Sequence, residues 1–353
     1  MAKVLIKGNE AVAEAAIRSG CRYYFGYPIT PQTEIAEYMA KKMPTVGGLC
    51  LQAESEVAAI NMVYGAAASG VRVMTSSSSP GISLKSEGVS YIVGCDLPCV
   101  ILNVQRGGPG LGGIQPAQSD YYQATKALGH GDMHLFVLAP SSVQEMAQLT
   151  ADAFGIADKY RMPVLILADG ALGQMMEPVD FDALHFTPEP EKPWAANGHG
   201  NKRKKNIHTS LFLKPEELES NILERAKKYE LVDVNEIRYE NYLCDDADIV
   251  IVSFGITARI SKAAVNEARA RGIKTGLLRP ITLSPFPAPE LLRLADTASA
   301  FLSVELNMGQ MVNDVRLAVQ CRKPVEFFGR TGGSLPSSED VLEQIIKISG
   351  GLK

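Results

Sequence analysis

The sequence predicts an α/β protein with a doubly wound parallel sheet, followed by a second, smaller α/β domain. Apolar, β-branched segments alternate with helical segments over residues 3–170. These apolar segments lack the polar alternation of half-exposed strands, which is typical of strands that helices cover on both faces. The rhythm is lost near residue 173 and returns at Ala247, so we expect two such units.

The first unit is expected over residues 1–172. Asn9 is predicted to cap the first helix and Gly20 to end it. Ser142 and Glu145 have the spacing of a capping box in front of a long helix. Strands are expected at residues 4–6, 23–25, 48–52, 71–76, 100–104, 135–139 and 163–169, and the helices between them at 10–19, 32–42, 56–68 and 83–94.

Residues 173–240 are interpreted as a linker or an excursion across the surface, because they combine several prolines, a Gly- and Asn-containing segment and one charged helix near 215–229. Residues 241–353 form the second domain. Its strands are expected within 248–255, 274–280, 300–306 and 324–329, and its helices at 258–271, 287–295, 309–320 and 338–348.

Composition limits the functional classes. The chain has 353 residues, of which 46% are hydrophobic and 21% charged, as in soluble globular proteins with ample material for a core. The net charge of −4 does not favour nucleic acid or an anionic membrane as a partner. The basic run 202–205 is interpreted as a solvated surface segment. No apolar run reaches the roughly 18 residues of a membrane span.

Cysteine and histidine usage predicts no metal site. The six cysteines are scattered and form no C-x-x-C pair, which favours reduced thiols in a cytoplasmic protein. His130 and His134 have the spacing of a zinc-binding helix, but Gly131 stands where that motif needs its glutamate.

Four loops follow four consecutive strands of the first domain: YPITP, QAESE, TSSSSPG and QRGGPGLGG. Ligands of open α/β sheets collect beyond the carboxyl ends of the strands. The four loops are therefore expected to converge on one site.

The YPITP loop allows two interpretations. Pro28 and Pro31 restrict the backbone around Thr30, and Thr30 with Pro31 has the form of an N-cap and a first helical residue. The loop is then either a rigid helix cap or, in addition, a helix start where a carboxylate could bind to unpaired N–H groups and the Thr30 hydroxyl.

The QAESE loop places Glu54 and Glu56 at the start of an almost wholly apolar helix. Acidic residues at a helix N-terminus are ordinary partners of the helix dipole. A glutamate between a strand end and such a helix could also exchange a proton. One of the two is a candidate catalytic residue.

The remaining two loops are weaker indications. TSSSSPG offers hydroxyls and a sharp turn. QRGGPGLGG contains Gly108, Gly110 and Gly113 in the spacing of a dinucleotide fingerprint, but Pro109 interrupts it and the loop follows a late strand. We interpret it as a flexible loop over the site, with Arg106 as an anion clamp.

These four segments, in this order, resemble the α subunit of the 2-oxoacid:ferredoxin oxidoreductases, a thiamine-diphosphate family split over several chains. The carrying residues are Y-P-I-T-P at 27–31, S-E-x-A-A at 55–59, the Ser-rich turn at 75–81 and Q-R-G-G-P-G at 105–110. VSFGITARI and TGLLRPITLSPFP resemble the family's transketolase-C-terminal-like domain. The resemblance implies that residues 1–172 form a thiamine-diphosphate pyrimidine-type domain.

The resemblance also implies residue roles. Glu56 would contact N1′ of the aminopyrimidine and favour its imino tautomer, and Glu54 would lie behind it. Substrate contacts would come from Thr30, with Tyr27, Pro28, Ile29 and Pro31 of the same loop, and from Arg106, Ser78 and Ser79.

Two missing motifs imply partner chains. No G-D-G followed by a suitably spaced Asn is present, so a β subunit would supply the Mg²⁺ and diphosphate site. No C-x-x-C-x-x-C run is present, so iron–sulfur clusters would lie on partner chains. The resemblance implies, besides the β subunit, a γ subunit, a ferredoxin-like δ subunit, ferredoxin and CoA.

Within the family, the short chain and the GGPGLGGIQP loop are most similar to the branched-chain type that acts on 3-methyl-2-oxobutanoate, with the 2-oxoglutarate type close behind. Two hypotheses of other classes remain: an oxidoreductase that binds NAD through its glycine loop, and a non-catalytic partner subunit that has lost the site.

Overall fold

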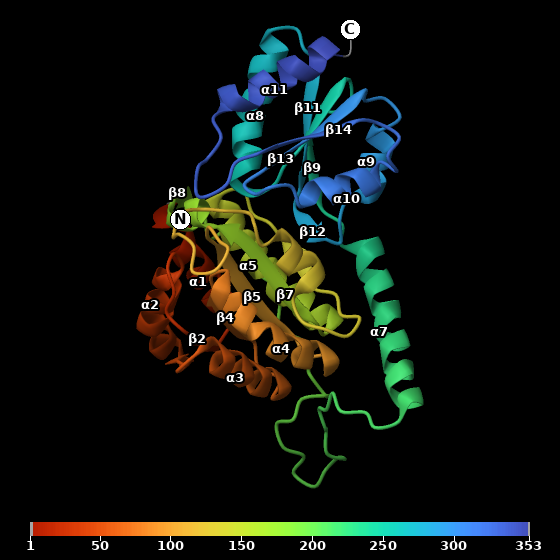
Figure 1. Cartoon of the computed structure of the whole chain (residues 1–353). Helices are drawn as coiled ribbons and strands as arrows, with labels where there is room; N and C mark the ends of the chain where they lie inside the picture. The colour runs from red at the N-terminus through yellow and green to blue at the C-terminus, as the bar shows by residue number, and fades with distance from the viewer. Residues whose placement is uncertain (1–2, 352–353) are drawn as a thin grey trace.

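The computed structural model describes residues 3–351 and contains two main sheets (Figure 1). The larger sheet has seven strands in the order β12-β6-β7-β5-β4-β2-β3. Its strands pair in parallel, apart from the antiparallel edge strand β12. The strands are β2 (Tyr23–Gly26), β3 (Leu49–Gln52), β4 (Val73–Ser77), β5 (Cys99–Gln105), β6 (Phe136–Leu138), β7 (Pro163–Asp169) and β12 (Thr282–Ser284).

Helices cover both faces of this sheet, as the doubly wound class requires. Alternate residues of β5 point to opposite faces, so that Ile101 packs in one core cluster and Leu102 in the other. The first cluster contains residues of α3 (Glu56–Ala68) and α4 (Pro80–Gly94); the second contains residues of α1 (Gly8–Arg18), α2 (Thr33–Lys42) and α5 (Val143–Tyr160). The predicted fold class is confirmed.

The first predicted strand lies outside the large sheet. β1 (Val4–Lys7) pairs antiparallel with β8 (Met176–Val179) in a separate two-stranded sheet. Asn9 is not the cap of α1, because the helix already begins at Gly8; its side chain instead donates to the Pro31 carbonyl and to Glu34. The predicted capping contact of Ser142 is confirmed, since its hydroxyl accepts from the backbone N–H of Glu145.

The second sheet has five strands in the order β14-β13-β10-β11-β9. It is parallel except for β9, which pairs antiparallel with β11. The strands are β9 (Tyr239–Tyr242), β10 (Ile249–Val252), β11 (Thr275–Pro280), β13 (Ala300–Glu305) and β14 (Val325–Gly329). The helices are α8 (Gly255–Ala270) and α11 (Ser338–Gly351), which pack on each other, and α9 (Ala288–Leu294) and α10 (Met311–Ala318), which form a second pair.

The two sheets are connected by a strand that crosses from one to the other and by side-chain hydrogen bonds. Strand β12, which follows β11 in sequence, leaves the second sheet and pairs with β6 at the edge of the first. At a second joint, Gln118 donates to the Phe254 carbonyl and accepts from Thr257. The division at residues 172 and 240 stays a prediction.

The segment between the sheets runs across the surface (Figure 1). After α6 (Gly170–Gln174) and β8 it forms a long irregular loop, which projects beyond the body, and then α7 (Pro215–Asn235), which stands along one side. Residues 201–205, with the basic run, are exposed, as predicted. Within residues 3–351, no helix has the length and apolar character needed to span a membrane.

Candidate functional site

The four loops singled out in the sequence lie at one edge of the large sheet. They follow β2, β3, β4 and β5, which are neighbours in the order β5-β4-β2-β3 and run parallel. Carboxyl ends of parallel neighbours meet at the same edge. The expected convergence is therefore present, and the loops differ in what they expose there.

Glu56 is the buried acid of this edge. It is the first residue of α3, whose N-cap Ser55 accepts a hydrogen bond from the Ala58 N–H, and it is only 5% exposed. Glu54, two residues earlier, is exposed. Within residues 3–351, no side chain or backbone N–H donates a hydrogen bond to the Glu56 carboxylate. A buried carboxylate without an internal donor is the chemistry expected of a group that contacts a ligand.

The Ser-rich turn, whose Ser77 lies near that carboxylate, carries hydroxyls of two kinds. Ser76 is bonded internally, to Tyr24 at 2.7 Å and to Gln32 at 2.5 Å. Ser77 and Ser78 are fully buried, and neither hydroxyl has a hydrogen-bond partner among the described residues. Unpaired buried hydroxyls cost free energy, so they indicate a site that something else completes.

Ser77 and Glu56 meet at Gly81, in the first turn of α4. A Cβ added at Gly81 would lie 2.5 Å from Glu56 Oε1 and still closer to Ser77 Oγ. Because Gly81 has no side chain, Glu56 Oε1 and Ser77 Oγ can both lie close to the backbone of α4 at this position.

Ser79 has a different role. Its φ of 24° is unusual for a residue with a Cβ. The turn is held by the Ser79 N–H, which donates to Asn103 at 3.1 Å, and by the hydroxyl, which lies 2.5 Å from the Asp120 carboxylate. Burial raises the pKa of Asp120 above its usual range. The Ser79 hydroxyl is thus engaged inside the protein, and its predicted contact with substrate stays a prediction.

Arg106 links two of the loops. Its guanidinium donates from Nη1 to the Thr30 carbonyl and from Nη2 to the Leu111 carbonyl, both at 3.0 Å. Its Nε is buried without a partner among the described residues. Arg106 therefore holds the YPITP turn against the glycine loop, and its Nε is left without a partner.

The YPITP turn differs from the prediction in one respect. Thr30 is not the N-cap of α2, because that helix begins at Thr33 after a turn in which the Gln32 N–H donates to the Ile29 carbonyl. Pro31, joined to Thr30 by a cis peptide bond, is buried, and its carbonyl accepts from Asn9. The turn leaves Tyr27, Pro28 and Thr30 exposed and Ile29 half-buried.

The glycine loop is a closed surface turn. The Gly107 N–H donates to the Gln115 carbonyl and the Gly113 N–H to the Gly107 carbonyl, and residues 108–115 between them are exposed. A π-helical turn at Gln123–Ala127 is the next helical element, so the loop does not lead into a helix N-terminus. The geometry of a dinucleotide fingerprint is therefore missing.

Sequence reasoning missed three polar groups of this edge: the buried Gln32 and Lys85 and the half-buried Asp120. Lys85 is fully buried in α4 and donates to Thr75 Oγ1 at 2.9 Å. It stands in an SLKSEG segment that has the composition of a surface turn of a helix. Only the apolar residues around it, Ile82 and Val89, indicated that the helix is buried on this side.

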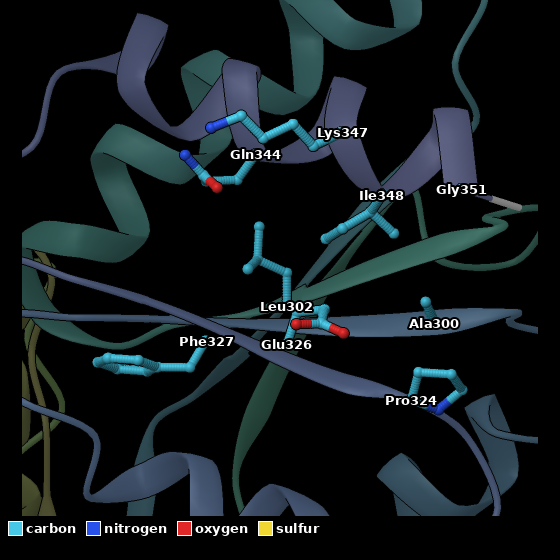
Figure 2. Close-up of a pocket in the computed structure, with 9 residues that line it drawn as sticks. All are labelled: Ala300, Leu302, Pro324, Glu326, Phe327, Gln344, Lys347, Ile348 and Gly351. Carbon is cyan, nitrogen blue, oxygen red and sulfur yellow. The ribbon is translucent and has the colours of Figure 1, made fainter.

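Two cavities within residues 3–351 are lined by residues outside the four loops. One of about 420 Å³ separates α11 from β13 and β14, with Gln344, Lys347 and Ile348 above Leu302 and Glu326 (Figure 2). Another, of about 170 Å³, is lined mainly by residues 128–133, including His130 but not His134. Among residues 3–351, no group of three or more His, Cys, Asp or Glu side chains is arranged to hold a metal ion.

Comparison with known sequences identifies the family. The family profile "Pyruvate flavodoxin/ferredoxin oxidoreductase, thiamine diP-bdg" matches residues 14–229, and "Pyruvate:ferredoxin oxidoreductase core domain II" matches residues 247–341. The ketoisovalerate oxidoreductase subunit VorB of Methanothermobacter thermautotrophicus is 52% identical over 99% of both chains. The chain belongs to the 2-oxoacid:ferredoxin oxidoreductase family.

Other family members are more distant. The 2-oxoglutarate synthase subunit KorA of the same organism is 36% identical over 98% of both chains. The solved 2-oxoglutarate:ferredoxin oxidoreductase of Magnetococcus marinus is 26% identical with a TM-score of 0.84; it is matched over 98% of this chain but only 65% of its own. An inactive split-gene transketolase tetramer, at 16% identity and a TM-score of 0.61, shows the shared fold alone.

The residues at the sheet edge fit one end of thiamine diphosphate, the coenzyme that the family profile names. Glu56 offers a carboxylate, and Ser77 and Ser78 offer buried unpaired hydroxyls, for a polar ring. The described part of the chain holds no cluster suited to Mg²⁺ beside them. The carboxylate and the two hydroxyls thus fit the polar aminopyrimidine ring.

Proposed function

We propose that the chain is the α subunit of a 2-oxoacid:ferredoxin oxidoreductase, which carries out the CoA-dependent oxidative decarboxylation of a 2-oxo acid to acyl-CoA and CO₂ with reduction of ferredoxin. The observation that carries this proposal is the buried Glu56 carboxylate, without an internal hydrogen-bond donor, at the edge where four loops converge.

Glu56 is assigned the contact with the coenzyme ring. Bound thiamine diphosphate supplies the carbon nucleophile that attacks the 2-oxo acid and stabilises the charge left by decarboxylation. The carboxyl of Glu56 holds and returns a proton at N1′ of the ring. Burial supports this role because water, which would compete for the same hydrogen bond, is kept away from the carboxylate. Glu54, more exposed, is assigned to the outer side of the same contact.

The substrate is assigned to the space between the YPITP turn and the Ser-rich turn. Thr30 has an exposed hydroxyl that can donate to the substrate carboxylate, and Arg106 adds a positive charge through its unused Nε donor. Ser78 offers a further free hydroxyl. Apolar surface for the rest of the substrate comes from Tyr27, Pro28 and Ile29 of the turn, and the buried Pro31 supports them from behind.

Partner chains complete the site in this proposal. A β subunit supplies the diphosphate and Mg²⁺ site, iron–sulfur clusters lie on partner chains, and γ and ferredoxin-like δ subunits bring CoA and electron transfer into the complex. Large apolar side chains exposed at this edge support a chain–chain contact here: Leu111 is 84% and Ile114 58% exposed. We place the complex in the cytoplasm, since five of the six cysteines are unpaired thiols that are buried or half-buried.

The favoured substrate is 3-methyl-2-oxobutanoate. Support comes from the higher identity to a ketoisovalerate oxidoreductase subunit, 52%, than to a 2-oxoglutarate synthase subunit, 36%. A 2-oxoglutarate enzyme is the alternative, because the discrimination of two side chains can depend on very few contacts. A non-catalytic partner subunit is the second alternative.

The test is to purify the complex with its native partner chains and to measure reduction of a viologen dye with a panel of 2-oxo acids and CoA. We expect the highest kcat/KM with 3-methyl-2-oxobutanoate. A preference for 2-oxoglutarate would favour the first alternative. Turnover that Glu56→Gln leaves unchanged would contradict the catalytic assignment and favour the second.

A further inference from the structure

Lys85 is a buried lysine whose neighbourhood does not offset the cost of burying it. Its side chain is fully buried and its ammonium donates one hydrogen bond, to the neutral Thr75 hydroxyl at 2.9 Å. Within residues 3–351, no carboxylate forms a direct ion pair with it. Desolvation of an ammonium costs several kcal/mol, so a lysine kept in this state calls for a functional reason.

A second buried lysine shows how the charge of a buried ammonium is usually neutralised. The side chain of Lys192 is only 7% exposed and forms ion pairs with Asp158 at 2.9 Å and Glu189 at 2.7 Å. Two carboxylates at contact distance neutralise its charge. Among the described residues, Lys85 has no carboxylate at contact distance. Its charge can therefore be offset only by a negative group that lies beyond hydrogen-bond distance.

The geometry of α4 directs Lys85 towards the site. Lys85 lies one turn after Gly81, and long side chains of a helix lean towards its N-terminus. Gly81 is the point at which Glu56 Oε1 and Ser77 Oγ approach α4. Thr75, which holds the ammonium, and Ser77 share one face of β4 because they are two residues apart. The ammonium and the Glu56 carboxylate thus lie on the same side of α4, beside the same strand.

The charge of Glu56 is the main favourable electrostatic influence on Lys85. Burial lowers the pKa of Lys85 to about 8, and the negative charge of Glu56 opposes that decrease. Cys99 carries no charge near neutral pH, because burial raises the pKa of its thiol to about 12. Glu56 comes from α3 and Cys99 from β5, and the group that packs on Lys85 from β4 is the neutral Thr75. Glu56 is therefore the counter-charge of this lysine.

We propose that Lys85 is a positioning residue for Glu56: its ammonium, anchored by Thr75, stabilises the negative charge of the Glu56 carboxylate and holds that carboxylate towards the edge of the sheet. The inference rests on the proposed function, because it concerns the residue assigned to the coenzyme ring. Lys85 itself touches neither ring nor substrate. It compensates for the burial that would otherwise disfavour the charged carboxylate.

The main test compares Lys85→Met, Glu56→Gln and the double variant in the complex purified with its partner chains. Met has the length of the lysine stem and no charge. We expect Lys85→Met to lower kcat/KM about tenfold at pH 7 and to shift the pH–rate profile of the complex, because the edge of the sheet loses a buried positive charge. Lys85→Met should add almost nothing in the Glu56→Gln background, since the two residues act as one unit.

A second readout does not depend on the loaded enzyme. In the full chain without coenzyme, the lowered pKa of Lys85 means that the unfolded state binds more protons between about pH 8 and pH 10.4. Stability should rise with pH through that window in the wild-type chain relative to Lys85→Met, and the Tm of Lys85→Met at pH 7 should equal or exceed that of the wild type. Lys85→Gln gives the same comparison if the methionine variant does not fold.

Lys192→Met is the matched control. Its loss leaves Asp158 and Glu189 without their cation, so we expect a lower Tm with an unchanged pH–rate profile. An unshifted profile in Lys85→Met, or independent effects of the two substitutions, would overturn the inference while leaving the proposed function intact. Full activity of Glu56→Gln would instead remove the proposed function and, with it, the role of Lys85.

Discussion

The carboxyl edges of the two main sheets differ in the hydrogen bonding of their buried polar groups. At the second sheet, the Glu305 carboxylate accepts from Ser303, Asn307 and the N–H groups of the first residues of α10. At the first sheet, the Glu56 carboxylate accepts no hydrogen bond from residues 3–351. The hydroxyls of Ser77 and Ser78 also have no hydrogen-bond partner among these residues. Both glutamates are buried, at 0% and 5% exposure.

This difference separates a completed joint from an incomplete site. A buried polar group left unpaired costs about 1–3 kcal/mol, so a fold that is complete by itself pairs nearly all of them. The edge with Glu305 is closed by the first domain, since Asn307 also donates to the Gln118 carbonyl. The edge with Glu56 retains unpaired groups, as expected where a coenzyme and a partner chain supply the missing contacts. Each prediction below tests this contrast.

The largest effect is expected for Glu56→Gln. A glutamine cannot exchange a proton with the ring, so kcat should fall about 10³-fold, within the range of general acid–base contributions. The Tm of the chain should fall less than in Glu305→Gln, because no internal hydrogen bond is lost and only the counter-charge of Lys85 is removed. Steady-state kinetics and a melting curve of the same preparation measure both. The exposed Glu37→Gln, on α2, serves as control and should retain wild-type turnover.

Glu305→Gln should have the reverse result. The amide NH₂ of a glutamine would take the place of one carboxylate oxygen and would lie against N–H donors, with which it cannot form hydrogen bonds. We therefore expect the free energy of unfolding to fall by about 3 kcal/mol. The enzyme that remains folded should keep its kcat. Urea denaturation followed by circular dichroism measures the loss. A change below about 1 kcal/mol would mean that this edge is not the completed joint described above.

Asp169 tests the joint through pH. Asp169 is the last residue of β7, and its carboxylate accepts from the N–H groups of Ala171, Leu172 and, across the domains, Ile256 at 3.2 Å. Burial raises the pKa of Asp169 to about 6 despite these bonds. The folded state therefore binds more protons than the unfolded state between about pH 4 and pH 6, and stability should fall as pH rises through that window.

Asp169→Asn should remove this dependence. Asparagine can still cap α6 but does not titrate. The difference in unfolding free energy between wild type and variant should change by about 2 kcal/mol between pH 4 and pH 7, as measured by urea denaturation. Taking the difference cancels the other carboxylates. A difference that stays constant over this range would show that Asp169 does not titrate differently on folding.

Arg106→Lys tests the first edge with a smaller effect. The guanidinium reaches the Thr30 and Leu111 carbonyls with separate nitrogens, which a single ammonium cannot do. We expect the substrate turn to loosen and KM for the 2-oxo acid to rise about tenfold, equivalent to about 1.4 kcal/mol. Arg269→Lys in the second domain is the control: separate guanidinium nitrogens of Arg269 likewise reach the Thr275 and Leu243 carbonyls, and this substitution should leave KM unchanged.

The sequence predicted the features that depend on residues close together in the chain and missed those that depend on residues far apart. The apolar runs and the convergence of loops followed from local pattern, and α3 begins at Glu56 as expected. The N-cap at Thr30 was wrong because Pro31 is anchored by Asn9, which lies 22 positions away. β1 was placed in the wrong sheet for a similar reason: its partner β8 is distant in sequence.

The unpaired groups themselves were beyond local reasoning. Four consecutive serines stand in the turn, and nothing in the letters shows that Ser76 and Ser79 are bonded while Ser77 and Ser78 are free. Which hydroxyl finds a partner depends on Gln32 and Asp120 from other loops. The resemblance to a family supplied the site as a whole, whereas the state of each polar atom required the assembled sheet.

The smallest effect is expected for a pair of serines in equivalent places. Ser77 ends β4, and Ser253 directly follows β10. The Ser253 hydroxyl lies 2.9 Å from the Val304 carbonyl and 2.8 Å from Thr257 Oγ1, whereas the Ser77 hydroxyl has no partner among the described residues. Ser253→Ala should lose about 1 kcal/mol in unfolding free energy, the usual net value of a buried hydrogen bond.

Ser77→Ala should instead keep or slightly raise stability, because it removes a buried hydroxyl that the chain does not satisfy. Its cost should appear only with the coenzyme, as weaker binding of thiamine diphosphate to the assembled complex, measured by titration of the apo complex. A Ser77→Ala variant that is destabilised like Ser253→Ala would mean that the Ser77 hydroxyl already has a partner in the free chain. The two strand edges would then differ in their loops and not in the completeness of their polar contacts.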